Sequence, residues 1–122
     1  MNNPTFDVEP LIQDYLAAWN APDSTKRDLL LDKVLAPDCI YADSHLPDLV
    51  KTKELHGQFI DRFRSKFADL QISLISTVDA HHNFFRFRWQ LAKSAGEVFT
   101  EGIFFGELND SQKISKLVGF VE

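Results

Sequence analysis

The spacing of the hydrophobic residues changes near Asp69, and no other feature of the sequence constrains the fold as much. Before Asp69, apolar residues recur at intervals of three and four, as on one face of an α-helix; after it they alternate with polar residues, as in a strand with one buried face. The segment 85–91 alternates throughout, because Arg86, Arg88 and Gln90 separate its apolar residues. Helices followed by a run of strands predict an α+β fold, with the helices packed on one face of an antiparallel sheet.

The residues before Asp69 are expected to form three helices, with one short strand between the second and the third. The predicted helices cover 5–20, 24–35 and 53–67, and the short strand covers 39–43. Asp23 or Ser24 is the expected N-cap of the second helix, and Thr52 is that of the third. The strands predicted after Asp69, joined by hairpin turns, cover 72–78, 85–91, 98–108 and 114–121.

Length, charge and cysteine content narrow the classes of protein. The chain has 122 residues, which suits a single domain over 1–122 with one hydrophobic core. Its net charge of −5 argues against nucleic acid or an anionic membrane as a partner. No apolar run approaches the roughly 20 residues of a membrane span, and the start MNNPTF lacks the blocks of a secretory signal. The single cysteine, Cys39, excludes an internal disulfide and suits a reducing compartment, so a cytoplasmic protein is expected.

The spacings typical of metal, nucleotide and nucleophile motifs are absent from the sequence. It contains no HxxxH, HxH or multi-cysteine pattern, and no GxSxG, P-loop or GxGxxG pattern. His81 and His82 are adjacent in an expected hairpin turn and are interpreted as turn residues. We therefore expect neither a metal nor a cofactor.

Both alternating sets of residues in the segment 97–107 contain large side chains. One set holds Val98, Thr100 and Phe104, and the other holds Phe99, Ile103 and Phe105. Three helices in a domain of this size can cover only one face of a sheet. The outer face is therefore expected to meet a second copy of the chain as a homodimer, the alternative being a partly apolar surface on a monomer.

The order of these elements resembles the NTF2-like (SnoaL-like) superfamily over nearly the whole chain. The stretches that carry the resemblance are LIQDYLAAW (11–19), LAPDCIYADSH (35–45), FIDRFRSKFADLQ (59–71), RFRWQL (86–91), EGIFFGEL (101–108) and KISKLVGF (113–120). The resemblance implies a sheet that curls around the helices into a cone with a pocket, and cones that pair through their outer sheet faces. The superfamily includes isomerases, dehydratases, polyketide cyclases, epoxide hydrolases, non-enzymatic binders and transport adaptors, so the resemblance implies a pocket rather than a reaction.

Asp43 is the first candidate for catalysis. It ends the short strand and, by alternation, shares a face with Cys39 and Tyr41. Resemblance to the ketosteroid-isomerase branch implies a general base here, and a carboxylate against aromatic walls is poorly solvated and therefore more basic. The alternative interpretation is an Asp that caps the following turn through Ser44 and His45.

Tyr15 is the second candidate, on the apolar stripe of the first helix. The same resemblance implies that it binds the carbonyl oxygen of a substrate; the alternative is core packing, with the hydroxyl bound to water or a backbone carbonyl. The second oxyanion donor of that branch is a protonated acid, and Phe104 stands at the matching position. A Phe there makes the pocket more apolar and favours binding over catalysis.

Two histidines could assist Asp43 in the acid–base chemistry of a dehydratase or a cyclase. His45 follows Asp43 in a turn, and His56 lies at the edge of the apolar stripe of the third helix. The alternatives are a solvated loop residue for His45 and a satisfied core-edge histidine for His56. The expected walls of the ligand pocket are Trp19, Phe59, Phe63, Phe85, Phe87, Trp89, Thr100 and Phe104.

Three functions stay open from the sequence. The first is a cofactor-independent enzyme, an isomerase or cyclase, that transfers a proton on a small hydrophobic carbonyl compound with Asp43 as base. The second is a binder of a small hydrophobic ligand without turnover. The third is a dimeric adaptor with a vestigial pocket, for which filling the pocket by Gly102→Leu should be harmless.

Overall fold

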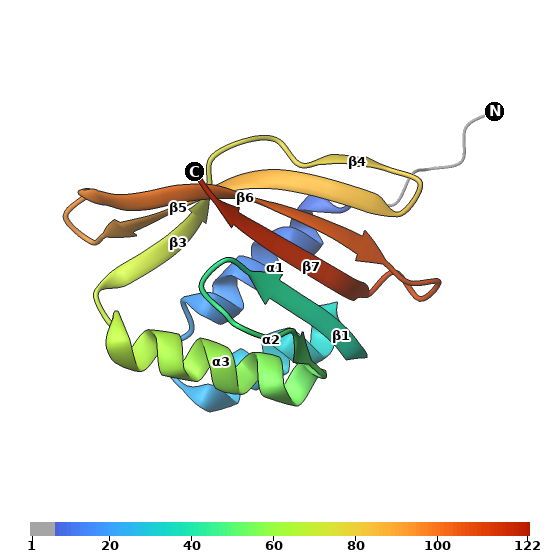
Figure 1. Cartoon of the computed structure of the whole chain (residues 1–122), viewed down its shortest axis with the longest axis horizontal. Helices are drawn as coiled ribbons and strands as arrows, with labels where there is room; N and C mark the ends of the chain where they lie inside the picture. Colours follow the sequence, from blue (N-terminus) through green and yellow to red (C-terminus); the bar gives the residue numbers. More distant parts are fainter. Residues whose placement is uncertain (1–6) are drawn as a thin grey trace.

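The computed structural model describes residues 7–122, which form one layer of three helices against one curved sheet (Figure 1). The helices are α1 (Glu9–Trp19), α2 (Ser24–Val34) and α3 (Lys53–Lys66). The strands are β1 (Leu35–Asp43), β2 (Val50–Lys51), β3 (Leu70–Leu74), β4 (Asp79–His81), β5 (Phe84–Lys93), β6 (Val98–Leu108) and β7 (Ile114–Val121). The predicted α+β architecture is confirmed, and the structure adds the short strands β2 and β4.

The helix boundaries follow from their caps. Asp23 is the N-cap of α2 and accepts a hydrogen bond from the Lys26 backbone N–H at 2.8 Å. Thr52 is the N-cap of α3 and accepts one from the Leu55 backbone N–H. The second helix ends one residue earlier than predicted, because Leu35 is already extended and pairs with β7. The first helix begins at Glu9; residues 5 and 6 of its predicted range lie outside the described residues.

The sheet is mixed rather than antiparallel. Its strand order is β2-β1-β7-β6-β5-β3, with β4 paired to β5, and the β1–β7 pair is parallel. Alternation indicates which face of the sheet each residue lies on, but not the direction of a distant partner strand. The sequence pattern therefore could not distinguish parallel from antiparallel pairing. The parallel pairing places Tyr41 opposite Leu117 and Asp43 opposite Gly119.

Glycines allow large rings to cross the inner face of the sheet. A Cβ at Gly102 would lie 2.3 Å from both the Phe120 carbonyl oxygen and Trp89 Cζ2. Gly102 therefore faces inward as predicted, but no side chain fits there. The Gly102→Leu substitution would disrupt the sheet instead of filling a pocket, so it cannot serve as a test of an adaptor function.

A β-bulge breaks the alternation predicted for 97–107. Leu91 of β5 pairs with Thr100, whereas the next residue, Ala92, pairs with Val98, so Phe99 is an extra residue in β6. Its ring lies 5.9 Å from that of Phe67, just after α3. The grouping of Val98 with Thr100 and Phe104, and of Phe99 with Ile103 and Phe105, was therefore wrong.

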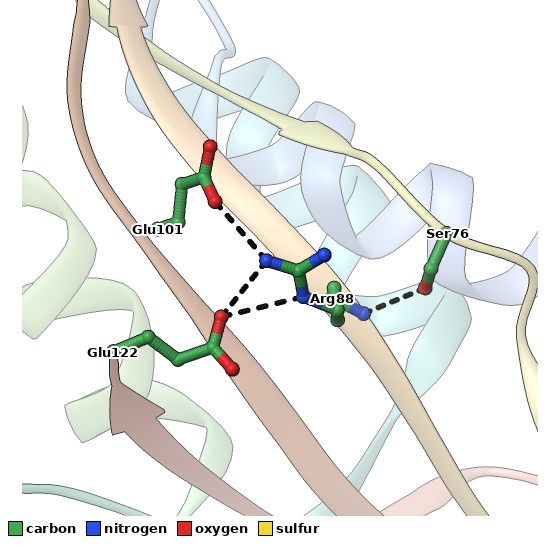
Figure 2. A network of polar contacts seen from close by, with 4 residues as sticks. All are labelled: Ser76, Arg88, Glu101 and Glu122. Atoms are coloured by element: carbon green, nitrogen blue, oxygen red, sulfur yellow. Dashed lines mark hydrogen bonds and ion pairs between the residues drawn. The ribbon is translucent and has the colours of Figure 1, made fainter.

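The outer face keeps a group of exposed phenyl rings and a charged network. Phe105 and Phe120 are 43% and 55% exposed, and Phe84 stacks on Phe105. Beside them Arg88 donates to Glu101 at 3.1 Å and to Glu122 at 2.9 Å, as Figure 2 shows. The Arg88 backbone N–H also donates to the Ser76 hydroxyl in the β3–β4 connection. Lys116 and Glu107 form a further ion pair on this face, and ion pairs this exposed contribute little to stability.

Within residues 7–122, no helix is long and apolar enough to cross a membrane.

Candidate functional site

A hydrogen-bonded pair of polar side chains lies in the middle of the core. Tyr15, from α1, and His56, from α3, are both 0% exposed, and the Tyr15 hydroxyl lies 2.8 Å from His56 Nε2. They come from positions 41 residues apart that the two helices bring together over the sheet. Tyr15 was expected to bind a substrate carbonyl, or else water or a backbone carbonyl; in this structure its partner is His56.

A second pair lies next to the first. The Tyr41 hydroxyl donates to Asp43 Oδ2 at 2.7 Å, and the Tyr41 ring centroid lies 4.6 Å from that of His56. Asp43 Oδ1 accepts the backbone N–H of His45 at 2.8 Å. Asp43 therefore caps the turn, as in the second interpretation of this residue, and it also binds an interior phenol. The His45 side chain is exposed in the turn.

Tyr41 is the residue that the sequence analysis missed as a functional candidate. It was noted only as a neighbour of Asp43 on one face of the strand. The signal was present, since residues two apart in a strand point to the same side, and a phenol two residues before a carboxylate can reach it.

Burial sets the protonation of these groups. It raises the pKa of Tyr15 and of Tyr41 well above the ordinary value of 10, and it lowers the pKa of His56 from 6.5 to about 3. The indole N–H of Trp19 opposes the rise for Tyr15, although it does not reach hydrogen-bond geometry with the phenol. At neutral pH the interior therefore holds two neutral phenols and a neutral imidazole. Burial also raises the pKa of Cys39 to about 12, which makes the thiol unreactive.

Two buried nitrogen atoms beside these pairs lack a partner among the described residues. They are Trp19 Nε1 and His56 Nδ1. In a neutral imidazole one nitrogen carries the proton and the other accepts, so either tautomer leaves Nδ1 with an unused donor or acceptor. An unpaired buried polar group costs on the order of 1–3 kcal/mol, which a ligand or a water could offset.

Aromatic rings surround the two pairs. Phe104 makes edge-to-face contacts with Tyr15 at 6.2 Å and with Tyr41 at 6.1 Å. Phe59 lies 5.1 Å from Tyr41. Trp19 contacts both Tyr15 and Tyr41. Phe104, which stands where the ketosteroid-isomerase branch has an acid, therefore packs directly on both phenols.

The other expected wall residues differ in how close they come. Phe63 contacts Trp19, and Phe87 and Trp89 contact Phe104. Within the described residues, the Phe85 ring meets only that of Phe87, so it belongs to the core behind the site. Thr100 lies beside the bulge, opposite Leu91.

The interior is filled by its own side chains in this structure. Tyr41 and Phe104 are 1% and 2% exposed, which leaves no room for a ligand between them. Two recesses of about 620 and 200 Å³ open elsewhere, the larger between α1, β3 and the β5–β6 hairpin, and the smaller beside α2 and α3. Neither is lined by the residues of the two pairs.

The described part of the chain contains no group of three metal-ligating side chains. His81 and His82 lie at the β4–β5 turn as expected, and their Nδ1 atoms are 2.8 Å apart on the surface. His82 has a positive φ, as residues of such turns often do. Two exposed nitrogen atoms alone do not make a structural metal site.

No family model and no curated protein matches the chain, but solved structures do. A proposed isomerase of the SnoaL-like family from Agrobacterium tumefaciens is 31% identical, with a TM-score of 0.85 over 93% of this chain and 95% of that one. A proposed SnoaL-like polyketide cyclase from Jannaschia is 13% identical, with a TM-score of 0.78 over 100% and 90%. A proposed ketosteroid isomerase from Kribbella flavida is 14% identical, with a TM-score of 0.69 over 95% and 78%. The last two support the fold alone.

Proposed function

The chain belongs to the SnoaL-like family, and from this premise we propose that it transfers a proton on a small hydrophobic carbonyl compound, as an isomerase or a cyclase. One observation carries the proposal: two neutral phenols flank one neutral imidazole inside an aromatic shell, and one of the phenols binds a carboxylate. A hydrophobic core needs none of these polar groups. Proton transfer needs a base, and it needs donors that stay neutral at working pH.

Asp43 is the proposed base. It lies at the end of β1, half-buried, so one side reaches the interior and the other reaches the turn. The Tyr41 hydroxyl and the His45 backbone N–H hold its two oxygen atoms in place. A carboxylate that is oriented before the substrate arrives loses less entropy when it reacts.

Tyr15 is the proposed donor to the substrate carbonyl. When His56 Nε2 carries the ring proton, it donates to the Tyr15 oxygen and leaves the phenol O–H free for a carbonyl. The imidazole itself remains neutral because burial lowers its pKa to about 3. His56 is thus a positioning residue that orients the phenol from α3.

The reaction conserves every atom. Asp43 removes a proton from the carbon next to the carbonyl, and the electron pair moves to the carbonyl oxygen as an enolate. The Tyr15 O–H stabilises that oxygen by a hydrogen bond. Where a carbon–carbon double bond lies next to the enolate, Asp43 returns the proton to its far carbon, which gives the isomer. Alternatively the enolate carbon attacks a second carbonyl of the same molecule, which closes a ring, and Asp43 gives its proton to the alkoxide that forms.

An exchange assay tests the proposal without knowledge of the natural substrate. We would incubate 2-tetralone with the protein in D₂O and follow incorporation of deuterium next to the carbonyl by mass spectrometry. Asp43→Asn should lower the exchange rate by about 10²–10⁴. Asp38→Asn is the matched control, because Asp38 lies on the same strand but is exposed. Equal exchange by wild type and Asp43→Asn would refute the mechanism, and retention of a bound compound without exchange would favour a non-catalytic binder.

We also propose that two copies associate through the outer sheet face. The exposed rings of Phe84, Phe105 and Phe120, on adjacent strands, support this arrangement. Rings this large are costly to leave in water, and a second copy offers a matching apolar surface.

A further inference from the structure

The strand β3 lies at one end of the sheet and has a free edge. On its other side it pairs with β5, and the Ile75 backbone N–H just after it also donates to β5, to the Arg88 carbonyl at 3.0 Å. The backbone groups of successive residues in a strand point to opposite edges. Those of Leu70, Ile72 and Leu74 are therefore directed to the free edge, where the strand of another molecule could pair with them.

The Asn20 side chain closes the middle of this edge. Asn20 is the C-cap of α1, 52 positions before Ile72 in the sequence. Its Nδ2 donates to the Ile72 carbonyl at 2.8 Å, and its Oδ1 accepts the Ile72 backbone N–H at 2.9 Å. A side-chain amide offers the same donor and acceptor as a peptide group. Asn20 therefore makes both hydrogen bonds that Ile72 would otherwise exchange with a further strand.

The two sides of Asn20 differ along the edge. Before it, the Leu70 backbone N–H donates to the Phe67 carbonyl at 3.1 Å, and the Leu70 carbonyl accepts from the Arg64 guanidinium. After it, Leu74 lines the larger recess, of about 620 Å³, together with Asn20 itself. Open space therefore adjoins the part of the edge that follows Ile72.

This part of the edge is complementary to itself. If two copies of β3 run antiparallel about Ser73, Ile72 of each copy pairs with Leu74 of the other. That register uses only the backbone groups directed to the free edge and leaves the bonds of Leu70 intact. The Ser73 side chains, which are small and exposed, would lie opposite each other at the centre.

We propose that the free edge of β3 fits the same edge of a second copy, and that the Asn20 amide keeps it closed. This contact would extend the sheet, and it is separate from the association proposed for the outer face. Loss of the amide frees both backbone groups of Ile72 at once. Unpaired groups at a strand edge are a template for pairing with another chain.

Native mass spectrometry of Asn20→Ala tests the proposal. The variant should form species of at least twice the wild-type mass, at concentrations at which the wild type keeps a single mass. Asn20→Ser, whose side chain is too short to bind both groups of Ile72, should act in the same direction. Asn109→Ala is the matched control, because Asn109 also binds backbone N–H groups, but in the β6–β7 turn, and it should keep the wild-type mass.

A second substitution tests the register of the pairing. In the Asn20→Ala protein, Ser73→Lys should restore the wild-type mass, because the two lysines would lie directly opposite each other. Gln71→Lys adds the same charge at another exposed position of β3 but faces no like charge in this register. It should leave the larger species in place.

Three results would overturn the proposal. The first is a wild-type mass in both Asn20 variants, and the second is an equal gain of mass in Asn109→Ala. The third is a gain of mass that both lysines, or neither, reverse, which would indicate association elsewhere or through unfolded chains; circular-dichroism melts identify the latter. The measurement compares each variant with the wild type and needs no turnover, so it does not depend on the outer-face association or on proton transfer.

Discussion

The stability of this protein should depend on pH through one buried side chain, His56. Burial lowers the pKa of its imidazole from 6.5 to about 3, so the folded protein keeps the ring neutral over a range in which the unfolded chain protonates it. The unfolded state then binds more protons than the folded state, and stability rises with pH. The contribution is complete above pH 6.5, is lost as the pH falls below that value, and levels off near pH 3.

The expected effect is large compared with the stability of a small domain. Each pH unit inside this window is worth about 1.4 kcal/mol. Lowering the pH from 7.5 to 5.0 should therefore cost about 2 kcal/mol through His56 alone, out of the roughly 5–15 kcal/mol that hold a domain together.

Urea unfolding at the two pH values measures this loss, and two variants isolate it. His56→Gln keeps a hydrogen-bonding group for Tyr15 without a titrating ring, and His56→Leu removes the polar group altogether. Both should lack the extra loss of about 2 kcal/mol, which corresponds to a shift in midpoint of about 1 M urea. The exposed His45, His81 and His82 are common to all three proteins, so their contributions cancel.

Equal pH dependence in wild type and both variants would refute the reasoning. It would mean that His56 is solvated or protonated in the folded state, and the neutral positioning role proposed for it would then fall as well.

Two further predictions concern the sheet. Gly102→Ala should lower the free energy of unfolding by about 3 kcal/mol, because its Cβ would meet the Phe120 carbonyl and the Trp89 ring. Gly96→Ala, at a positive φ in open space, should lower it by about 1–2 kcal/mol. A smaller loss for Gly102→Ala than for Gly96→Ala would contradict the close approach at Gly102. Phe105→Glu should give a monomer by native mass spectrometry under conditions in which the wild type is a dimer. Phe99→Ala should remain a dimer, because the bulge takes Phe99 off the outer face. A monomeric wild type would disprove the homodimer.

The architecture could be predicted because local signals determine most of it. Hydrophobic spacing locates the helices and the long strands, and the caps at Asp23 and Thr52 mark two helix starts. The parallel β1–β7 pair could not be predicted, since it depends on where two distant strands meet. The bulge at Phe99 was equally hidden, because an extra residue in one strand is visible only against the register of its partner.

The site was harder to predict than the fold. Tyr15 and His56 were each identified as candidates, but nothing in the sequence indicated that they bind each other. The contact between Tyr41 and Asp43 follows from alternation along one strand and was within reach of the sequence. That the interior is closed depends on how many large rings fit between α1, α3 and the sheet, a question of volume that spacing does not answer.

His56 finally links stability and function. An aliphatic residue at this position would bury no unpaired nitrogen and would not lose stability below pH 6.5, so as a core residue His56 is a poor choice. A molecule that pairs with Nδ1 and with Trp19 Nε1 would remove that cost when it binds, and it would stabilise the folded state in proportion to its concentration. A core without function should therefore become more stable when His56 is replaced by Leu together with Tyr15 by Phe. In a ligand site the same double variant should gain that stability and lose the proton exchange that Tyr15 and His56 are proposed to support.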